Sequence, residues 1–162
     1  MALSFLAKCY SLENNKKIFF FIVDHKLREN STFEANLVKK KLKTFKISSN
    51  ILTIKKKKIS KNIQSSAREN RYKLIIKKSL IKKIDMILTA HHSNDLIENF
   101  FIRLLRGSGL KGLISFSNIK SKITLDDKIF ILRPLLDIPK KDLMYISKNT
   151  FNFNVNDPSN LD

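Results

Sequence analysis

Several residue types are scarce in this chain of 162 residues, and each scarcity excludes a class of protein. Cys9 is the single cysteine, which rules out an internal disulfide and any CxxC pair that holds zinc or an iron-sulfur cluster. No apolar run approaches the roughly 20 residues that cross a bilayer, and the opening MALSFLA is too short for an anchor or a signal peptide. The sequence therefore predicts a soluble, cytoplasmic protein without a membrane segment.

Acidic residues are also scarce relative to basic ones. The chain has 14 Asp and Glu against 32 Lys and Arg, a formal net charge of +18. Such a charge attracts polyanions, and nucleic acid is the first candidate partner. An AT-rich source genome would give the same abundance of lysine without any function, so a single lysine carries little information. Hydrophobic residues make up 43% of the chain, which is enough for one globular domain with a core.

Compact apolar runs alternate with helical patterns along the chain. The expected strands are residues 17–23, 50–54, 85–90 and 129–132. The expected helices are residues 31–45, 62–80 and 94–106, with a last helix opened by Pro139, whereas residues 115–128 read as a polar surface excursion. This alternation predicts an α/β fold with a Rossmann-like parallel sheet and helices on both faces.

Polar pairs follow two of the predicted strands. Asp24 and His25 come directly after the first strand, and His91 and His92 come after the third. Ligands of parallel sheets bind beyond the carboxyl ends of the strands, so both pairs are expected at the ligand-binding edge.

The stretch TAHHSNDLIENFFIRLLRGSG, residues 89–109, contains the second pair and a predicted helix. Helical periodicity places Ile97, Phe101 and Leu104 on one stripe, which we expect to be core. Asp95 and Glu98 lie one turn apart near the helix N-terminus, where their carboxylates can converge on a cation. The alternative is a solvated first turn, and for His92 a partly buried structural histidine.

The turn RGSG that follows this helix also has two interpretations. Arg106 supplies a fixed positive charge, and Gly107 and Gly109 let the backbone approach a ligand. A glycine in this place equally serves as an ordinary helix C-cap.

Five separated motifs carry a resemblance to a known family: VDHKLRENS (23–31), NIQSSARENRY (62–72), TAHHSNDLIENFFIRLLRGSGLKGL (89–113), LRPLL (132–136) and DPSN (157–160). In order and spacing they resemble the N-terminal catalytic domain of the tRNA(Ile)-lysidine synthetases, over nearly the whole chain. Related thiolases that modify tRNA cytidines share that fold but carry CxxC cysteines, which this sequence lacks.

The resemblance implies a PP-loop ATP pyrophosphatase fold, of the adenine nucleotide alpha hydrolase type, as a single domain over residues 1–162. It implies a ligase that uses ATP with Mg²⁺ to adenylate the wobble cytidine of the tRNA(Ile) with a CAU anticodon. Free L-lysine then displaces AMP to give lysidine. Homodimerisation is left open.

The resemblance also implies roles for individual residues. The candidate catalytic residues combine carboxylates for the cationic lysine, an imidazole that orients the nucleotide or accepts a proton, and a cation for phosphates: His91, Asp95, Glu98 and Arg106. The candidate nucleotide-binding residues are Val23, Asp24, His25, Gly107 and Gly109. The candidates for tRNA phosphates or the adenylate are Arg28, Arg68, Arg71 and Arg133. No dedicated transition-metal site is predicted.

The sequence departs from the family pattern in several places. The loop SGGxDS is absent, and Met1 falls where the family continues after it, so we expect the first strand, its phosphate-binding amides and a magnesium aspartate to be missing. The end at DPSNLD also reads as shortened. Leu96, Asn99 and Ser66 replace the usual glutamine, threonine and arginine. The alternative function is therefore a non-catalytic basic fragment that binds nucleotide or tRNA. Without the first strand the sheet would expose unpaired edges, so we also expect the folded chain to be marginally stable.

Overall fold

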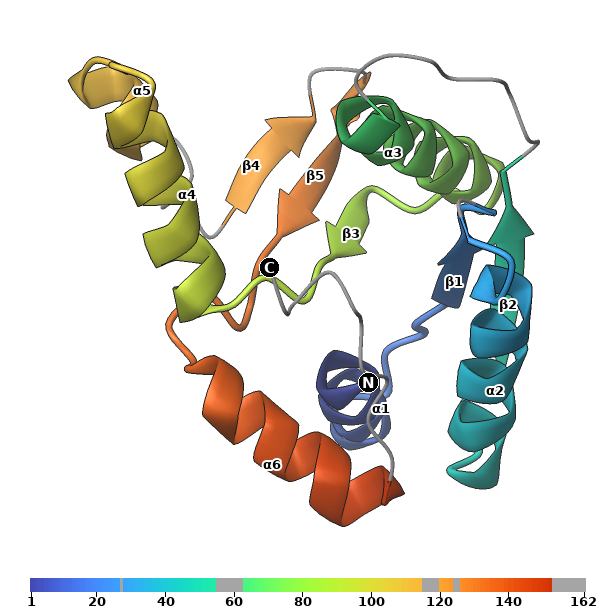
Figure 1. Cartoon of the computed structure of the whole chain (residues 1–162). Coiled ribbons are helices and arrows are strands. Elements are labelled where there is room, and N and C mark those ends of the chain that lie inside the picture. Colours follow the sequence, from blue (N-terminus) through green and yellow to red (C-terminus); the bar gives the residue numbers. More distant parts are fainter. Residues whose placement is uncertain (27, 55–62, 115–119, 124–125, 153–162) are drawn as a thin grey trace.

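The chain forms parallel strands that alternate with helices, as the sequence predicts (Figure 1). The computed structural model describes residues 1–26, 28–54, 63–114, 120–123 and 126–152. The lysine run at 55–58 and the motif DPSN lie outside the described residues. Within the described ranges, no helix is both long and apolar enough to cross a membrane.

The order of elements matches the predicted alternation, with three additions. In chain order they are α1 (Ala2–Glu13), β1 (Phe20–Asp24), α2 (Ser31–Thr44), β2 (Ser49–Thr53), α3 (Ile63–Ile81), β3 (Met86–Leu88), α4 (Ser93–Leu105), α5 (Leu110–Ile114), β4 (Lys120–Ile123), β5 (Asp126–Leu132) and α6 (Lys140–Phe151). Helix α1, helix α5 and strand β4 are the elements that the sequence reading does not anticipate.

Strand β4 corrects the prediction that residues 115–128 form a surface excursion. Residues 120–123 pair antiparallel with β5, with Lys120 opposite Leu132 and Ser121 opposite Ile131. The sequence KSKI does not have the apolar alternation that predicts a strand. The strand forms because its backbone groups pair with β5, which does not depend on the side chains. Residues 115–119 and 124–125 lie outside the described ranges.

The strands are arranged in two sheets. In the first, β1 pairs parallel with β2, from Phe20 opposite Ser49 to Asp24 opposite Thr53. In the second, the order is β3-β5-β4, and β3 pairs parallel with β5. Within the described part of the chain, β1 and β3 each have a neighbouring strand on one side only. The predicted parallel pairing is confirmed. Strands β2 and β4 are edge strands too, so in the described part of the chain β5 alone is paired on both sides.

The core is divided in the same way. Three clusters of buried apolar side chains are present, and their fully buried members are Ile76, Ile87, Ile129 and Ile131 between α3 and the second sheet, Ala2, Leu135 and Leu143 between α1 and α6, and Leu42, Ile47 and Phe151 beside the first sheet. These separate clusters hold α3 against the second sheet and α2 against the first, which fixes where the strands end.

Helix α4 contradicts the prediction that its apolar stripe is core. Ile97, Phe101 and Leu104 are 54%, 54% and 49% exposed, and no residue of α4 is buried. Helix α4 packs chiefly against α5, and the two lie together at the left edge of Figure 1. The helix forms as predicted, but its stripe stays open because no other described element covers it.

Candidate functional site

The carboxyl end of β1 is held by a buried aspartate. Asp24 is 2% exposed, and its Oδ1 accepts hydrogen bonds from the Lys26 amide and the Ser31 hydroxyl, both at 2.9 Å. Its Oδ2 accepts a 2.7 Å bond from the Thr32 hydroxyl. Burial by itself raises the pKa of Asp24, but the bonds from Thr32, Lys26 and Ser31 outweigh it and keep the pKa below its usual value. Asp24 therefore fastens β1 to the start of α2.

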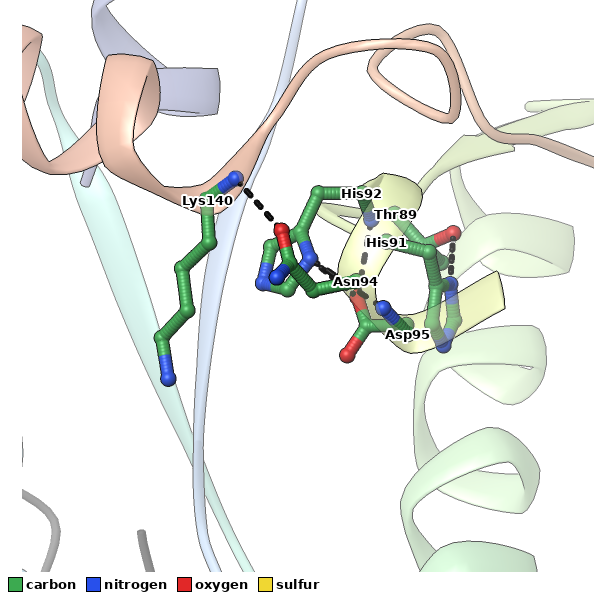
Figure 2. A network of polar contacts seen from close by, with 6 residues as sticks. All are labelled: Thr89, His91, His92, Asn94, Asp95 and Lys140. Carbon is green, nitrogen blue, oxygen red and sulfur yellow. Dashed lines mark hydrogen bonds and ion pairs between the residues drawn. The ribbon is translucent and has the colours of Figure 1, made fainter. Parts of the chain in front are cut away.

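The carboxyl end of β3 leads into a capped helix (Figure 2). The His92 amide donates to Asp95 Oδ2 at 2.8 Å, and the Asp95 amide donates to His92 Nδ1 at 3.3 Å, which makes a capping box. The same Nδ1 lies 3.2 Å from Asp95 Oδ2. The prediction of a structural histidine fits His92.

Further hydrogen bonds tie this helix start to the segment after β5 (Figure 2). The Lys140 amide donates to Asn94 Oδ1 at 2.9 Å, and the Ser93 amide donates to the Ile138 carbonyl at 3.0 Å. The Thr89 amide donates to the Leu132 carbonyl at 3.0 Å. These bonds bring the ends of β3 and β5 together, and with them the residues that follow each strand.

Three arginines act on the charge of His91 at the end of β3. Arg133 follows β5 and is 7% exposed, whereas Arg68 and Arg71 come from α3 and each lies 5.7 Å from the ring centre of Tyr72. Burial first, and then the charges of Arg133, Arg68 and Arg71, lower the pKa of His91 to about 4, although Asp95 opposes them. His91 is therefore neutral at pH 7, and its Nδ1 shares a 2.9 Å hydrogen bond with Thr89 Oγ1.

The charge of Arg71 acts on His25, which follows β1 in the first sheet, as well as on His91, which follows β3 in the second. Burial, and then the positive charge of Arg71, lower the pKa of His25, with Asp24 acting in the opposite direction. His25 Nδ1 is buried and has no hydrogen-bond partner within the described residues. Because Arg71 acts on both His25 and His91, the ends of β1 and β3 face a common cationic region.

This cationic cluster, defined as Arg68, Arg71 and Arg133 around His91, suits a phosphate-bearing ligand. Arg68 and Arg71 form no ion pair with a carboxylate in the described part of the chain, so their charges are available to an anion. Burial, and after it the charge of Arg68, lowers the pKa of Arg133, while Tyr72 opposes the shift. Like charges brought together in a half-buried place favour a multiply charged anion.

The described residues do not by themselves form a magnesium site. No group of three or more His, Cys, Asp or Glu side chains within them is placed to hold a metal ion. Both oxygens of Asp24 already accept hydrogen bonds, and Asp95 caps α4. We therefore assign no step to a protein-bound metal.

Other predicted site residues lie outside the cluster. Arg106 caps the far end of α4, eleven residues beyond Asp95 and about 16 Å along the helix axis at 1.5 Å per residue. Gly107 follows it with a φ of 68°, and an added Cβ at Gly107 or Gly109 would meet nothing within 4 Å. The remaining predicted residues are Val23 within β1, Arg28 exposed before α2, and Glu98 exposed one turn beyond Asp95.

Two residues near the site were missed by the sequence reading. Thr89 holds His91, and a threonine that directly follows a strand near two histidines is the signal that points to it. Arg103 donates to Asn99 Oδ1 at 2.7 Å and to the Gly112 carbonyl, which fixes α5 on α4. Asn99, which replaces the usual threonine of the resembled family, therefore has a structural partner here.

Comparisons with known proteins agree with this fold. The profile of the PP-loop domain family ATP_bind_3 matches residues 1–162, and the chain belongs to that family. Among its relatives is the tRNA(Ile)-lysidine synthase of Orientia tsutsugamushi (strain Boryong), 38% identical over 161 residues, which cover 99% of this chain and 35% of that protein. The enzyme of the same name from Rickettsia rickettsii (strain Sheila Smith) is 38% identical over 144 residues, covering 89% and 29%.

A solved structure supports the fold. The chain superposes on the U34-tRNA thiolase NcsA from Methanococcus maripaludis with a TM-score of 0.76, over 94% of this chain and 53% of that one, at 15% identity. The superposition establishes the α/β PP-loop fold, and at 15% identity it shows the fold alone. The chain spans about a third of the length of the tRNA(Ile)-lysidine synthases it matches.

Proposed function

We propose that this chain carries the catalytic region of a tRNA(Ile)-lysidine synthase. The reaction is the ATP-dependent ligation of L-lysine to the wobble cytidine of the tRNA(Ile) with a CAU anticodon. The observation that carries the proposal is the cationic cluster at the strand ends, in a chain whose relatives bear that name. The net charge of +18 favours binding to tRNA in addition.

The first half-reaction needs positive charge around phosphates. A bond forms between the wobble cytidine and the α-phosphate of ATP, the α–β phosphoanhydride bond breaks, and pyrophosphate leaves. Arg68, Arg71 and Arg133 are the residues we assign to these phosphates, because guanidinium groups bind phosphate oxygens in a fixed geometry. With a pKa of about 4, His91 is a weak base, so we assign it to orienting the nucleotide through its neutral ring.

The second half-reaction needs carboxylates for a cationic amino acid. The lysine amine attacks the adenylated cytidine, a carbon-nitrogen bond forms, AMP leaves, and the amine loses a proton. Asp95 and Glu98 are the candidate carboxylates, one turn apart at the start of α4. The Asp95 side chain is 34% exposed although it accepts the His92 amide, so a ligand can still reach it.

The alternative function is a non-catalytic basic fragment that binds nucleotide or tRNA. The arginine side chains at the described strand ends fit this reading, because they can bind phosphate by themselves, whereas a PP-loop enzyme also needs backbone amides around the phosphates.

Incorporation of labelled lysine separates the two functions. The chain as it stands is assayed with ATP and an isoleucine tRNA transcript that has a CAU anticodon, beside a version with a strand and SGGxDS loop added at its N-terminus. Incorporation by either version supports the synthase, and a transcript with another anticodon is the control. If both versions are folded and neither incorporates lysine, the binding fragment is the better description.

A further inference from the structure

Helix α3 carries a single aromatic side chain, Tyr72, near the middle of the helix. Its ring is half-buried and packs against the core cluster of Ile76, Ile87, Ile129 and Ile131. Packing against an aliphatic cluster requires an apolar side chain but not an aromatic one. The core by itself therefore does not explain why a tyrosine stands at this position.

Two arginine side chains lie against the Tyr72 ring. The guanidinium carbons of Arg68 and Arg71 are each 5.7 Å from the ring centre, which is within the range of a cation–π contact. Arg68 precedes Tyr72 by four residues, so these two side chains lie on the same face of α3. An arginine that stacks on a ring is restricted to fewer of its many rotamers.

The third arginine of the cationic cluster is related to the same tyrosine. Arg133 is 7% exposed at the end of β5. Burial and then the charge of Arg68 lower the pKa of Arg133, whereas Tyr72 acts in the opposite direction. The ring of Tyr72 thus contacts two arginines of the cluster, and its hydroxyl acts on the third.

The single carboxylate of α3 is engaged elsewhere. Glu69 pairs with Lys73 at 2.6 Å, and both side chains are more than half exposed, at 55% and 57%. A carboxylate would neutralise a guanidinium group, whereas an aromatic ring fixes its position and leaves its charge and its N–H donors available to a ligand. A ring is therefore the partner that an anion-binding arginine needs.

We propose that Tyr72 is a positioning residue of the candidate site, which holds Arg68, Arg71 and Arg133 in the arrangement that binds the polyphosphate of a nucleotide. Tyr72 acts through the arginines and does not itself touch the phosphates. Side chains that are restricted before the anion arrives lose less freedom when it binds, and two contacts of this kind account for roughly tenfold in affinity. The inference rests on the proposed function, because it assigns a residue to that same site.

Calorimetric titration of the full chain with inorganic pyrophosphate tests the proposal. Tyr72→Leu removes the ring but keeps an apolar side chain beside the core cluster, and it is expected to weaken pyrophosphate binding roughly tenfold. Tyr72→Phe keeps the ring and is expected to bind pyrophosphate within about threefold of the wild-type chain. The matched control is Tyr145→Leu, which makes the same change at a residue 72% exposed on α6 and leaves the binding unchanged.

The pKa of His91 separates positioning of the arginines from a loss of packing. Burial and then the charges of the three arginines lower this pKa, although Asp95 opposes them. Release of the arginines in folded Tyr72→Leu is therefore expected to raise the pKa of His91, as measured by proton NMR of the ring. If Tyr72→Leu does not fold, the wild-type chain decides, because the Tyr72 ring resonances are expected to shift when pyrophosphate binds the arginines beside it.

Several outcomes overturn the proposal. These are a wild-type chain that does not bind millimolar pyrophosphate, equal affinities of the wild-type chain and Tyr72→Leu, and a loss in Tyr72→Phe as large as that in Tyr72→Leu. Tyr72 resonances that stay unmoved at saturating pyrophosphate overturn it too. Because none of these measurements requires lysine transfer, a Tyr72 effect in a chain that leaves tRNA unmodified refutes the proposed function alone. Lysine transfer with an unaffected Tyr72→Leu refutes the role of Tyr72 alone.

Discussion

Lowering the pH from neutral towards 4 is expected to weaken the fold through His91. The pKa of His91 is about 4 in the folded chain, against 6.5 without the surrounding structure. Between these values the folded state binds fewer protons than the unfolded state. The stabilisation by the neutral ring is therefore fully present above pH 6.5 and is lost as the pH falls towards 4. His25 acts in the same direction because its pKa is also lowered.

The size of the effect follows from the pKa of His91. A fall from 6.5 to about 4 corresponds to about 3 kcal/mol for a fully shielded ring. His91 is half-buried, so solvent screening reduces its contribution to roughly 1–2 kcal/mol. The pKa of Asp24 lies below its model-compound value of 3.8, so its carboxylate loses its charge only at more acidic pH and does not obscure this window.

Urea unfolding across this pH range measures the effect. His91→Gln is expected to flatten the pH dependence, because glutamine cannot bind the proton. The matched control is His92→Asn, which keeps a good helix cap and leaves the His91 contribution unchanged. Proton NMR of the His91 ring gives its pKa directly, and added pyrophosphate is expected to raise that pKa by neutralising the arginines. A His91 ring that titrates near 6.5 refutes the cationic cluster.

Three further predictions concern the neighbouring elements. Thr32→Val removes the 2.7 Å donor to Asp24 and is expected to lower the free energy of unfolding by about 1–2 kcal/mol, whereas Thr44→Val, at an exposed hydroxyl, is expected to change it by less than about 0.5 kcal/mol in urea titrations. Arg71→Ala is expected to weaken tRNA binding about tenfold and to reduce the salt dependence of binding by about one ion, while Lys148→Ala on α6 has a smaller effect in filter binding. Adding a strand and SGGxDS loop at the N-terminus is expected to raise the melting temperature by several degrees, because the described edges of β1 and β3 are open; an unchanged temperature contradicts that reading.

Local patterns were sufficient to predict the strand ends and the helix starts. The run KIFFFIV followed by Asp24 and His25 indicates where β1 stops, and the histidine pair indicates where β3 stops. In the structure β1 ends at Asp24 and β3 at Leu88, one and two residues from the predicted ends at 23 and 90, because apolar runs and capping residues act within a few residues of chain. The charge relation between Arg71 and the two histidines is not visible in the sequence, because it depends on how α3 packs across the strands.

The exposed stripe of α4 shows where periodicity fails as a guide. The pattern of Ile97, Phe101 and Leu104 reports that one face of a helix is apolar, but not which surface covers it. Likewise, the division of the strands into two sheets depends on which edges meet in space and not on the composition of any strand. Strand β4 escaped prediction because its partner supplies the hydrogen bonds that its polar residues do not suggest.

Analysis of the modified nucleoside tests the central claim most directly. An isoleucine tRNA with a CAU anticodon is incubated with ATP, L-lysine and the version of the chain that carries the added strand and loop, and its nucleosides are then separated and weighed by mass spectrometry. The account predicts a lysine adduct on the wobble cytidine, lost in Arg71→Ala and retained in Lys148→Ala. Folded protein that binds this tRNA and ATP but leaves the wobble cytidine unmodified would contradict it.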